Sequence, residues 1–441
     1  MIIDLIIKDL KILLDGELVD RNILVDEGKI VGISKDARVA DRSYEGRGRI
    51  AIPGGVDIHV HFRDPSSNEA EDFESGTFAA AHGGITTVVD MPNTTPPVAT
   101  AEAFLEKRKI AEKKSYIDFG LYGGIGTKSI GNAVELAKAG ALGIKTYMAS
   151  QFPELSSYGT KELRETMLDV SKAGVPFMIH AEDLEAAIGG DSESSVSHAL
   201  KRPPICESVA IARVLELARQ LDIKVHICHL NSRAGLEVLK AFKSLGTSVT
   251  AETAPHYLSL TMEEMEKRGP YAKVDPPLRM KGDNEALLSG LKNRDIDLIA
   301  SDHAPHPKEE KERGWDEMNA APSGMPGVET TLPFLLDLFH KGRLGLSDII
   351  RVICVSPAEL LGLYPKKGAL AVGSDADITI VDPDRIFEVR HQNLLTKTHD
   401  SIFLGKNFHG SPAATFSRGE LIFEGGEVVA KPGRGKFLGT S

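Results

Sequence analysis

The stretch PGGVDIHVHFRDP, residues 53–65, decides the expected fold. The segment Ile50–His61 is apolar and rich in β-branched residues, which is typical of a buried strand. Side chains two positions apart on a strand point to the same face, so His59 and His61 should converge. Two imidazoles on one face can bind a Zn²⁺-like ion, and Arg63, at the next position of the same parity, can hold an anion beside it. Taken alone, an His-x-His pair favours two core histidines bonded to backbone carbonyls, so a metal site requires further ligands from elsewhere in the chain.

The composition is that of a globular protein with room for one large domain and a smaller one: 441 residues, 41% hydrophobic and 26% charged. No apolar run is long enough to cross a bilayer and the first residues lack the features of a signal peptide, so we expect a cytoplasmic protein without a membrane partner. The net charge of -11 argues against non-specific nucleic-acid binding. The three cysteines (Cys206, Cys228 and Cys354) are widely spaced, so any metal should be held by nitrogen and oxygen.

The two ends of the chain share one style. Residues 1–51 and 369–441 contain short candidate strands separated by turn signals such as Asp-Gly and Glu-Gly. Neither end has enough strands to form a stable sheet alone. We therefore expect the termini to pair into one small β-sandwich domain and to leave residues 52–368 as a separate catalytic domain.

The middle of the chain alternates apolar strands with helical stretches. The candidate strands are Ile50–His61, Ile85–Met91, Ile117–Gly123, Gly143–Met148, Val175–His180, Lys224–Leu230, Ser248–Thr253 and Ile296–Ser301. Eight such β/α units in about 300 residues predict an α/β fold of the TIM (β/α)8 barrel type, whose active sites lie at the C-terminal strand ends. An open doubly wound sheet is the alternative, although no G-x-G-x-x-G turn follows the first strand.

Residues capable of metal and proton chemistry occupy these strand ends. They are His59, His61, Asp90, Asn93, Lys145, His180, His229, Asp302 and His306. Their joint placement at the reactive face of a TIM barrel favours one functional site over a set of unrelated structural residues. His226 has the opposite strand parity from His229, so we expect it to face the helices and to be structural.

A lysine among metal ligands requires an explanation, because an ammonium group has no lone pair and repels a divalent ion. Lys145 could simply pair with Asp302. Alternatively, its deprotonated amine captures CO₂ to form a carbamate, whose two oxygens can bridge two cations. In that arrangement one ion is bound by His59, His61 and Asp302 and the other by His180 and His229. A hydroxide between the ions then serves as the nucleophile.

A family resemblance covers the whole barrel. The motifs, in chain order, are HVHFRDP (59–65), DMPNT (90–94), GIKTYM (143–148), IHAED (179–183), CHLNSR (228–233), AETAPHYL (251–258), PPLR (276–279), SDHAPH (301–306) and GMPGVET (324–330). This ordered set resembles the dihydroorotases of the amidohydrolase superfamily, specifically the branch with a carboxylated lysine. The resemblance implies that His59, His61, Lys145, His180, His229 and Asp302 bind two divalent ions, expected to be Zn²⁺. It further implies that Asp302 is the general acid/base and that Arg63, Asn93 and His306 hold the substrate carboxylate.

The implied reaction is the reversible cyclisation of N-carbamoyl-L-aspartate to L-dihydroorotate in pyrimidine synthesis. Hydantoinases and allantoinases share the metal ligands, but a substrate with a free carboxylate needs donors such as Arg63 and His306, whereas hydantoin does not. Asp275 stands where the resemblance leads us to expect asparagine before PPLR. A carboxylate only accepts hydrogen bonds unless it is protonated, so the substrate contact expected of Asp275 differs from that of an amide.

Two other functions stay open at this point. One is another cyclic-amide hydrolase, and the other is a non-catalytic barrel subunit of a pyrimidine-pathway assembly. The resemblance also raises a homodimer and an association with aspartate transcarbamoylase as possible partnerships. Two stretches, 150–158 and 307–322, are long enough to act as loops that close over the site.

Overall fold

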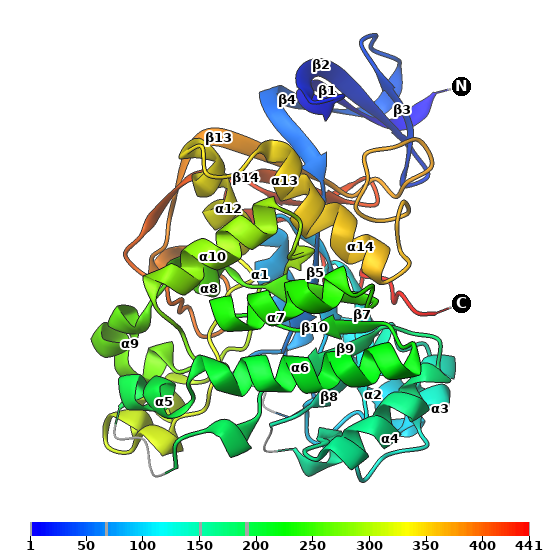
Figure 1. Cartoon of the computed structure of the whole chain (residues 1–441). Coiled ribbons are helices and arrows are strands. Elements are labelled where there is room, and N and C mark those ends of the chain that lie inside the picture. The colour runs from blue at the N-terminus through cyan, green and yellow to red at the C-terminus, as the bar shows by residue number, and fades with distance from the viewer. Residues whose placement is uncertain (1, 67–68, 150–151, 190–193, 441) are drawn as a thin grey trace.

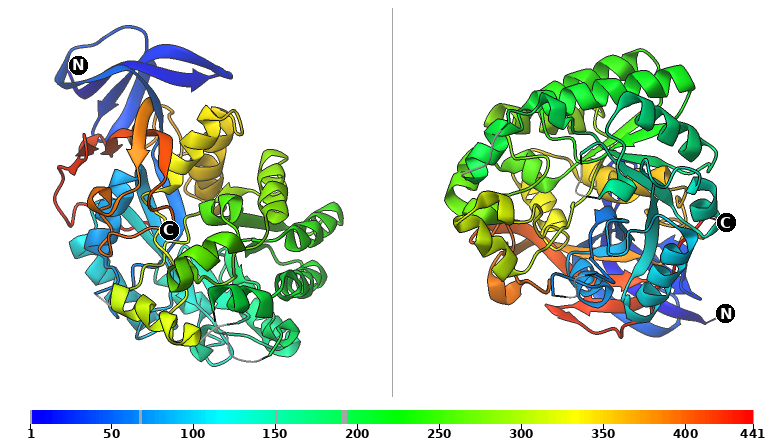
Figure 2. Two further views of the ribbon diagram at one scale, coloured as in Figure 1. Left: turned by 90° about the vertical axis from the view of Figure 1, so that its left-hand side faces the viewer. Right: turned by 90° about the horizontal axis from the view of Figure 1, so that it is seen from below.

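Two eight-stranded sheets organise the chain (Figure 1). The computed structural model describes residues 2–66, 69–149, 152–189 and 194–440. One sheet forms a barrel surrounded by helices, and the other, built from both ends of the chain, lies against the barrel (Figures 1 and 2). The N-terminal strands lie farthest from the barrel, at the top of Figure 1.

The barrel strands follow one another in chain order. They are β5 (Gly55–Val60), β6 (Ile85–Asp90), β7 (Asp118–Gly124), β8 (Gly143–Tyr147), β9 (Phe177–His180), β10 (Val225–Ile227), β11 (Val249–Thr253) and β12 (Leu298–Ile299). All neighbouring pairs are parallel. The first and last strands approach each other, since Val60 forms a parallel bridge with His303 and the Ser301 amide donates to Asp57 Oδ1 at 3.1 Å. The predicted TIM barrel is confirmed, and each predicted strand overlaps an observed one.

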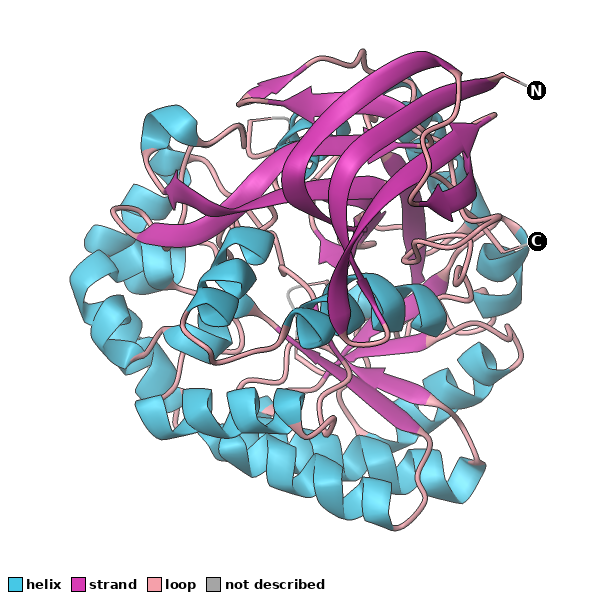
Figure 3. Cartoon of the chain, turned by 90° about the horizontal axis from the view of Figure 1, so that it is seen from above, coloured by secondary structure: helices cyan, strands magenta, loops and turns pink. Residues whose placement is uncertain are grey.

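Helices cover the outside of the barrel (Figure 3). The longer ones are α1 (Phe73–His82), α2 (Ala101–Lys114), α4 (Thr160–Ser171), α6 (Pro204–Leu221), α7 (Arg233–Ser244), α10 (Lys281–Lys292) and α12 (Thr331–His340). The shorter ones are α3 (Ala133–Lys138), α5 (Ser195–Lys201), α8 (Pro255–Ser259), α9 (Met262–Arg268), α11 (Lys308–Glu312), α13 (Leu346–Ile350) and α14 (Ser356–Leu360). Several begin at a capping side chain, as α1 does at Asp72 and α7 at Ser232, which accept from the backbone three residues later. In the described part of the chain, no helix has the length and apolar character needed to cross a membrane.

The two ends of the chain pair in a single sheet, as predicted. Its strands are β1 (Ile3–Leu14), β2 (Glu17–Asp26), β3 (Lys29–Ser34), β4 (Ala40–Pro53), β13 (Ile378–Glu388), β14 (Asn407–Ser417), β15 (Glu420–Glu424) and β16 (Glu427–Val428). Antiparallel pairing of β4 with β13 joins the N-terminal half to the C-terminal half. The sheet curves (Figure 3), and side chains from both halves share one apolar core, in which the rings of Tyr44 and Phe416 lie 5.1 Å apart.

One predicted strand is wrong in its extent. The segment Ile50–His61 is not one strand but the end of β4 and the whole of β5, which belong to different sheets. The chain passes between the sheets at Gly54, where a side chain would overlap Thr86 and where the amide donates to Asp377 O at 2.8 Å. The end of β4, residues 50–53, and the whole of β5 are buried, so the apolar pattern runs across the junction without a break.

A buried ion-pair cluster connects the barrel to the terminal sheet. Lys367 Nζ lies 2.6 Å from Asp118 Oδ2, 2.7 Å from Asp377 Oδ2 and 3.0 Å from Asp375 Oδ2. Asp118 also pairs with Arg418. The three carboxylates could in principle hold a metal ion, but the lysine ammonium already occupies the space between them.

Glu207 on α6 gives the stability of the fold a dependence on pH. The side chain is fully buried, its Oε1 accepts from the Asn231 amide at 2.8 Å, and burial raises its pKa from 4.5 to about 7. Because the pKa is raised in the folded state, the folded protein holds an extra proton between these values, and stability falls as the pH rises through them. Glu207→Gln should therefore gain stability relative to wild type by roughly 3 kcal/mol between pH 4.5 and pH 8.

Urea denaturation of both proteins at several pH values measures this difference. Glu237→Gln, which changes an exposed glutamate on α7, serves as the control and should leave the pH dependence of stability unchanged. Parallel stability curves for wild type and Glu207→Gln would contradict the assignment.

Candidate metal and substrate site

A cavity of about 400 Å³ opens at the C-terminal ends of the barrel strands. The predicted site residues that line it are His59, His61, Arg63, Asn93, His180, His229, Asp275, Asp302 and His306. Lys145 is fully buried and does not reach the cavity surface. Its Nζ lies 5.0 Å from the ring centroid of Tyr147, which lines the cavity, and its charge acts to lower the pKa of both His59 and His229. The fold thus brings all the predicted residues to one place.

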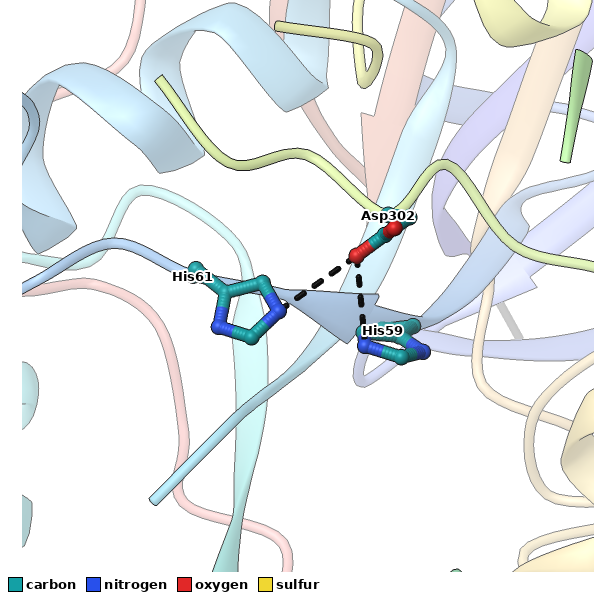
Figure 4. Close-up of side chains that lie close together, drawn as sticks. All are labelled: His59, His61 and Asp302. Carbon is teal, nitrogen blue, oxygen red and sulfur yellow. Dashed lines mark ion pairs between the residues drawn. The ribbon is translucent and has the colours of Figure 1, made fainter. Parts of the chain in front are cut away.

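His59 and His61 converge on Asp302 (Figure 4). Asp302 Oδ1 lies 3.3 Å from His59 Nε2 and 3.4 Å from His61 Nε2. Burial lowers the pKa of His61 to about 3, which leaves the ring neutral and able to donate a lone pair. Burial also disfavours a charge on His59, but the carboxylates of Glu252 and Asp302 outweigh it and raise the pKa of His59 to about 10. These three residues form a compact group of nitrogen and oxygen donors.

His180 and His229 form a second group beside the first. His180 Nδ1 lies 2.9 Å from His229 Nε2, and burial holds the pKa of His229 well below its usual value. The rings of His59 and His229 have their centroids 5.4 Å apart, so the two groups adjoin. Two ring nitrogens this close together can both bind one cation at the edge of the cavity.

Lys145 differs from the other fully buried lysines. Lys107 pairs with Asp90 at 2.5 Å, and Lys367 pairs with three aspartates. By contrast, Lys145 Nζ is buried without a hydrogen-bond partner among the residues that the structure describes, and the alternative pair with Asp302 does not form there. A buried ammonium group without an acceptor is strongly unfavourable, so a different chemical form of this side chain has to be considered.

The backbone is strained at three residues of the site. Arg63, His229 and Asp302 have φ values of 63°, 38° and 49°, in the left-handed region that residues other than glycine seldom adopt. Each such conformation costs about 1 kcal/mol or more. Residues held in this way at the ends of three different strands indicate positions determined by the site rather than by local stability.

Arg63 and His306 form a cationic corner of the cavity. The Arg63 guanidinium lies 3.1 Å from His306 Nε2, and its Nε atom is buried without a hydrogen-bond partner among the described residues. No carboxylate within the described ranges forms an ion pair with Arg63. His306 Nε2 also lies 3.0 Å from Ser323 O, while burial and the nearby Arg63 lower the pKa of His306 to about 4. The corner therefore offers a ligand a guanidinium group that has no ion pair with any described carboxylate, although His306 Nδ1 lies 3.6 Å from Glu310 Oε2.

Asp275 and Asn93 are already engaged in protein contacts. Asp275 Oδ1 accepts from His198 Nε2 at 2.8 Å and also pairs with Arg202. Burial disfavours its charge, but Arg202 outweighs this and holds the pKa of Asp275 well below its usual value. Asn93 Oδ1 lies 2.7 Å from His61 Nδ1, so Asn93 orients His61 from behind.

His226 does not face the helices, which corrects the parity argument. Its Nε2 lies 3.2 Å from Glu252 Oε2 and its Nδ1 lies 2.8 Å from Thr250 Oγ1, so the ring points to the inner residues of the barrel. The strand β10 ends at Ile227, and His229 has left-handed backbone, so strand alternation does not extend from His226 to His229.

Sequence reasoning missed several residues that complete the site: Tyr147, Glu182, Arg202 and Glu252. Tyr147 and Arg202 line the cavity, whereas both glutamates are buried behind histidines. Glu182 and Glu252 stand in the motifs IHAED and AETAPHYL, so a signal was present. Both expected loops reach the cavity, through Phe152 and Tyr158 on one side and Pro322 on the other, while positions 150 and 151 lie outside the described residues.

Comparisons with known proteins agree with the barrel and its site. Residues 50–422 match the model of the amidohydrolase family. A dihydroorotase from Methanosarcina acetivorans is 38% identical over 99% of this chain and 95% of its own, and an L-hydantoinase from Paenarthrobacter aurescens is 36% identical over 99% and 98%. The solved structure of an L-hydantoinase (dihydropyrimidinase) from Arthrobacter aurescens superimposes with a TM-score of 0.94 at 35% identity, with both chains covered completely. The chain belongs to the amidohydrolase family.

Proposed function

We propose that the protein is a dihydroorotase, which interconverts N-carbamoyl-L-aspartate and L-dihydroorotate. Similarity to several dihydroorotases, at 33–38% identity over nearly the whole chain, supports a hydrolase that acts on cyclic amides. The observation that carries the choice of substrate is the Arg63–His306 corner, because dihydroorotate has a free carboxylate and needs a cation to hold it.

The donor set fits two divalent ions, and Zn²⁺ suits a site rich in imidazole. His59, His61 and Asp302 would hold one ion, His180 and His229 the other, and a carbamate formed from CO₂ on Lys145 would connect them. The unpartnered Lys145 amine supports this, since the carbamate removes the positive charge and supplies two acceptor oxygens. When bound, such ions would polarise the amide carbonyl and lower the pKa of a water molecule.

The protein's own groups then have distinct tasks. Arg63 and His306 bind the substrate carboxylate and orient the ring within the cavity. Asp302, which faces both His59 and His61, accepts the proton of the attacking water when the ring opens and returns it when the ring closes. Phe152, Tyr158 and Pro322 narrow the mouth of the cavity.

The test uses wild type and Arg63→Gln with dihydroorotate, hydantoin, dihydrouracil and allantoin as substrates. Loss of charge-assisted hydrogen bonds should lower kcat/KM for dihydroorotate by about 10- to 100-fold and raise KM, because Arg63 contacts the carboxylate. Metal content should stay unchanged. Arg351→Gln, which changes a half-buried arginine away from the cavity, is the control and should keep wild-type kinetics.

The alternative function is that of a hydantoinase, which the 0.94 TM-score to an L-hydantoinase favours. Under that alternative, the wild-type protein prefers hydantoin to dihydroorotate, and Arg63→Gln leaves the hydantoin rate unchanged. Loss of metal from Arg63→Gln would also reject the substrate role of Arg63. A cytoplasmic location, a homodimer and an association with aspartate transcarbamoylase stay predictions.

A further inference from the structure

We propose that two buried glutamates, Glu252 and Glu182, fix which ring nitrogen His59 and His180 present to the metal ions, with one glutamate acting at each ion. The inference rests on the metal site of the proposed function but is independent of which cyclic amide is hydrolysed. Neither glutamate lines the cavity, so both are positioning residues that act through the histidines.

Glu252 holds His59 from behind. Its side chain is 1% exposed, its Oε1 contacts His59 Nδ1, and the same oxygen accepts from the His229 amide at 3.3 Å. A carboxylate only accepts hydrogen bonds, so His59 Nδ1 must carry the hydrogen that it donates. When the ring is neutral, as it must be to bind a metal ion, its lone pair is then on Nε2, the atom that faces Asp302 at 3.3 Å.

Glu182 holds His180 in the opposite sense. It is fully buried, and its Oε2 lies 3.2 Å from His180 Nε2. Here the hydrogen is on Nε2 and the lone pair is on Nδ1, the atom that faces His229 at 2.9 Å. The two histidines therefore present different ring nitrogens, and in each case the nitrogen turned away from the glutamate is the one turned toward the other candidate ligands.

The contacts behind the two glutamates differ in charge. Glu252 Oε2 is approached by His226 Nε2 at 3.2 Å, and His226 is held in turn by Thr250. Glu182 accepts two hydrogen bonds from the guanidinium of Arg202, one of them at 2.8 Å from Nε, and Arg202 also binds the cavity residue Asp275. Each carboxylate is thus held in position by contacts other than the one to its histidine.

The requirement follows from the chemistry of imidazole. A neutral ring has one N–H and one lone pair, and a ring with its N–H toward a cation cannot ligate it. Loss of a carboxylate that orients a ligating histidine typically weakens metal binding by 10- to 100-fold. If each glutamate serves one ion, its replacement should weaken one ion and spare the other.

The experiment measures Zn²⁺ binding by competition with a chromogenic chelator, without substrate, for wild type, Glu252→Gln and Glu182→Gln. Wild type should bind two ions tightly, and each variant should retain one while binding the other about 10- to 100-fold more weakly. Anomalous scattering from crystals with limiting zinc should place the retained ion at His180 and His229 in Glu252→Gln, and at His59 and His61 in Glu182→Gln. Glu207→Gln, a buried glutamate that touches neither histidine, is the matched control and should bind both ions normally.

Two further variants act one contact away and cover a failure of either glutamine variant to fold. Arg202→Met should weaken only the ion at His180, and His226→Phe only the ion at His59. Normal affinity for both ions in the folded variants would overturn the inference. It would also be overturned if every variant bound both ions with equally reduced affinity. A wild-type protein that binds both ions but does not turn over dihydroorotate would reject the proposed function alone.

Discussion

Asp302→Ala should lower turnover by at least about a thousandfold in both directions, which is within the range of a positioned general acid–base group. Asp302 Oδ1 lies within 3.4 Å of the Nε2 atoms of His59 and His61, and the residue lines the cavity. Ring opening and ring closure pass through the same transition state, so a group that carries the proton in one direction must return it in the other. Loss of the carboxylate therefore removes both activities together.

The proton balance of the proposed reaction predicts how its two directions depend on pH. At neutral pH N-carbamoyl-L-aspartate has two ionised carboxylates and dihydroorotate has one, so ring closure takes up a proton. As the pH rises, the ratio of open to closed form at equilibrium should increase by about tenfold per pH unit. This holds while both carboxylates stay ionised, which requires a pH well above a carboxyl pKa of about 4. We expect kcat/KM for opening to rise relative to that for closure as the pH rises, because the ratio of the two values equals the equilibrium constant. Closure needs the acid form of Asp302, which becomes scarcer as the pH rises because His59 and His61 outweigh burial and lower the pKa of Asp302 to about 2.

Steady-state assays in both directions from about pH 5.5 to about pH 9.5, with metal analysis of every sample, test these expectations. Asp337→Asn changes another buried aspartate, which lies on α12, pairs with Lys341 and does not line the cavity, and should retain wild-type turnover. Near-normal turnover by Asp302→Ala with its metals in place would exclude the proton-transfer role.

The barrel could be predicted because each of its strands is a short apolar segment bounded by a helix or a turn. The segment before His59 shows where this fails. The end of β4 and the whole of β5 are buried, so composition does not reveal that the chain changes sheets at Gly54. The contact of Gly54 with Thr86 depends on a residue 32 positions away and is absent from any local pattern. The pairing of the two ends could be predicted because neither has enough strands for a stable sheet, but the particular pairing of β4 with β13 could not.

The candidate ligands could be predicted because each follows its own strand. The role of Glu252 could not, because its contact with His59 forms only where the barrel closes, whereas Glu182 lies two residues from His180 within the motif IHAED and its role could have been inferred. Glu252 is 193 residues from His59 in sequence yet contacts it directly. The error at His226 has a local cause, since a three-residue strand and a left-handed residue at His229 break the alternation on which strand parity depends. Arg202 lies just after α5, away from the strand ends that carry the candidate ligands, so no strand pattern marks it.

Lys145→Met should lose both metal ions and lower turnover by at least about a thousandfold, the largest combined effect that we expect of a single substitution in this chain. A carbamate at this position would touch both ions, whereas each histidine would touch one. Methionine keeps the length and apolar stem of lysine but cannot capture CO₂. The variant should remain folded, because Lys145 Nζ has no hydrogen bond to lose among the described residues.

Intact-mass measurements under native conditions and a crystal structure of the wild-type protein should show one added CO₂ group on Lys145, and metal analysis should show about two ions per chain. Lys367→Met is the matched control, because it removes a lysine that is equally buried but paired with Asp118, Asp375 and Asp377. That variant removes the cation that the three carboxylates share, and Asp377 has no other ion pair among the described residues, so it should lose about 3 kcal/mol or more of stability and still bind both ions when folded. The two lysines thus separate a chemical role from a structural one. Wild-type protein that holds both ions with an unmodified Lys145 would refute the bridging role, because an unmodified lysine has no carbamate oxygens with which to bind the ions.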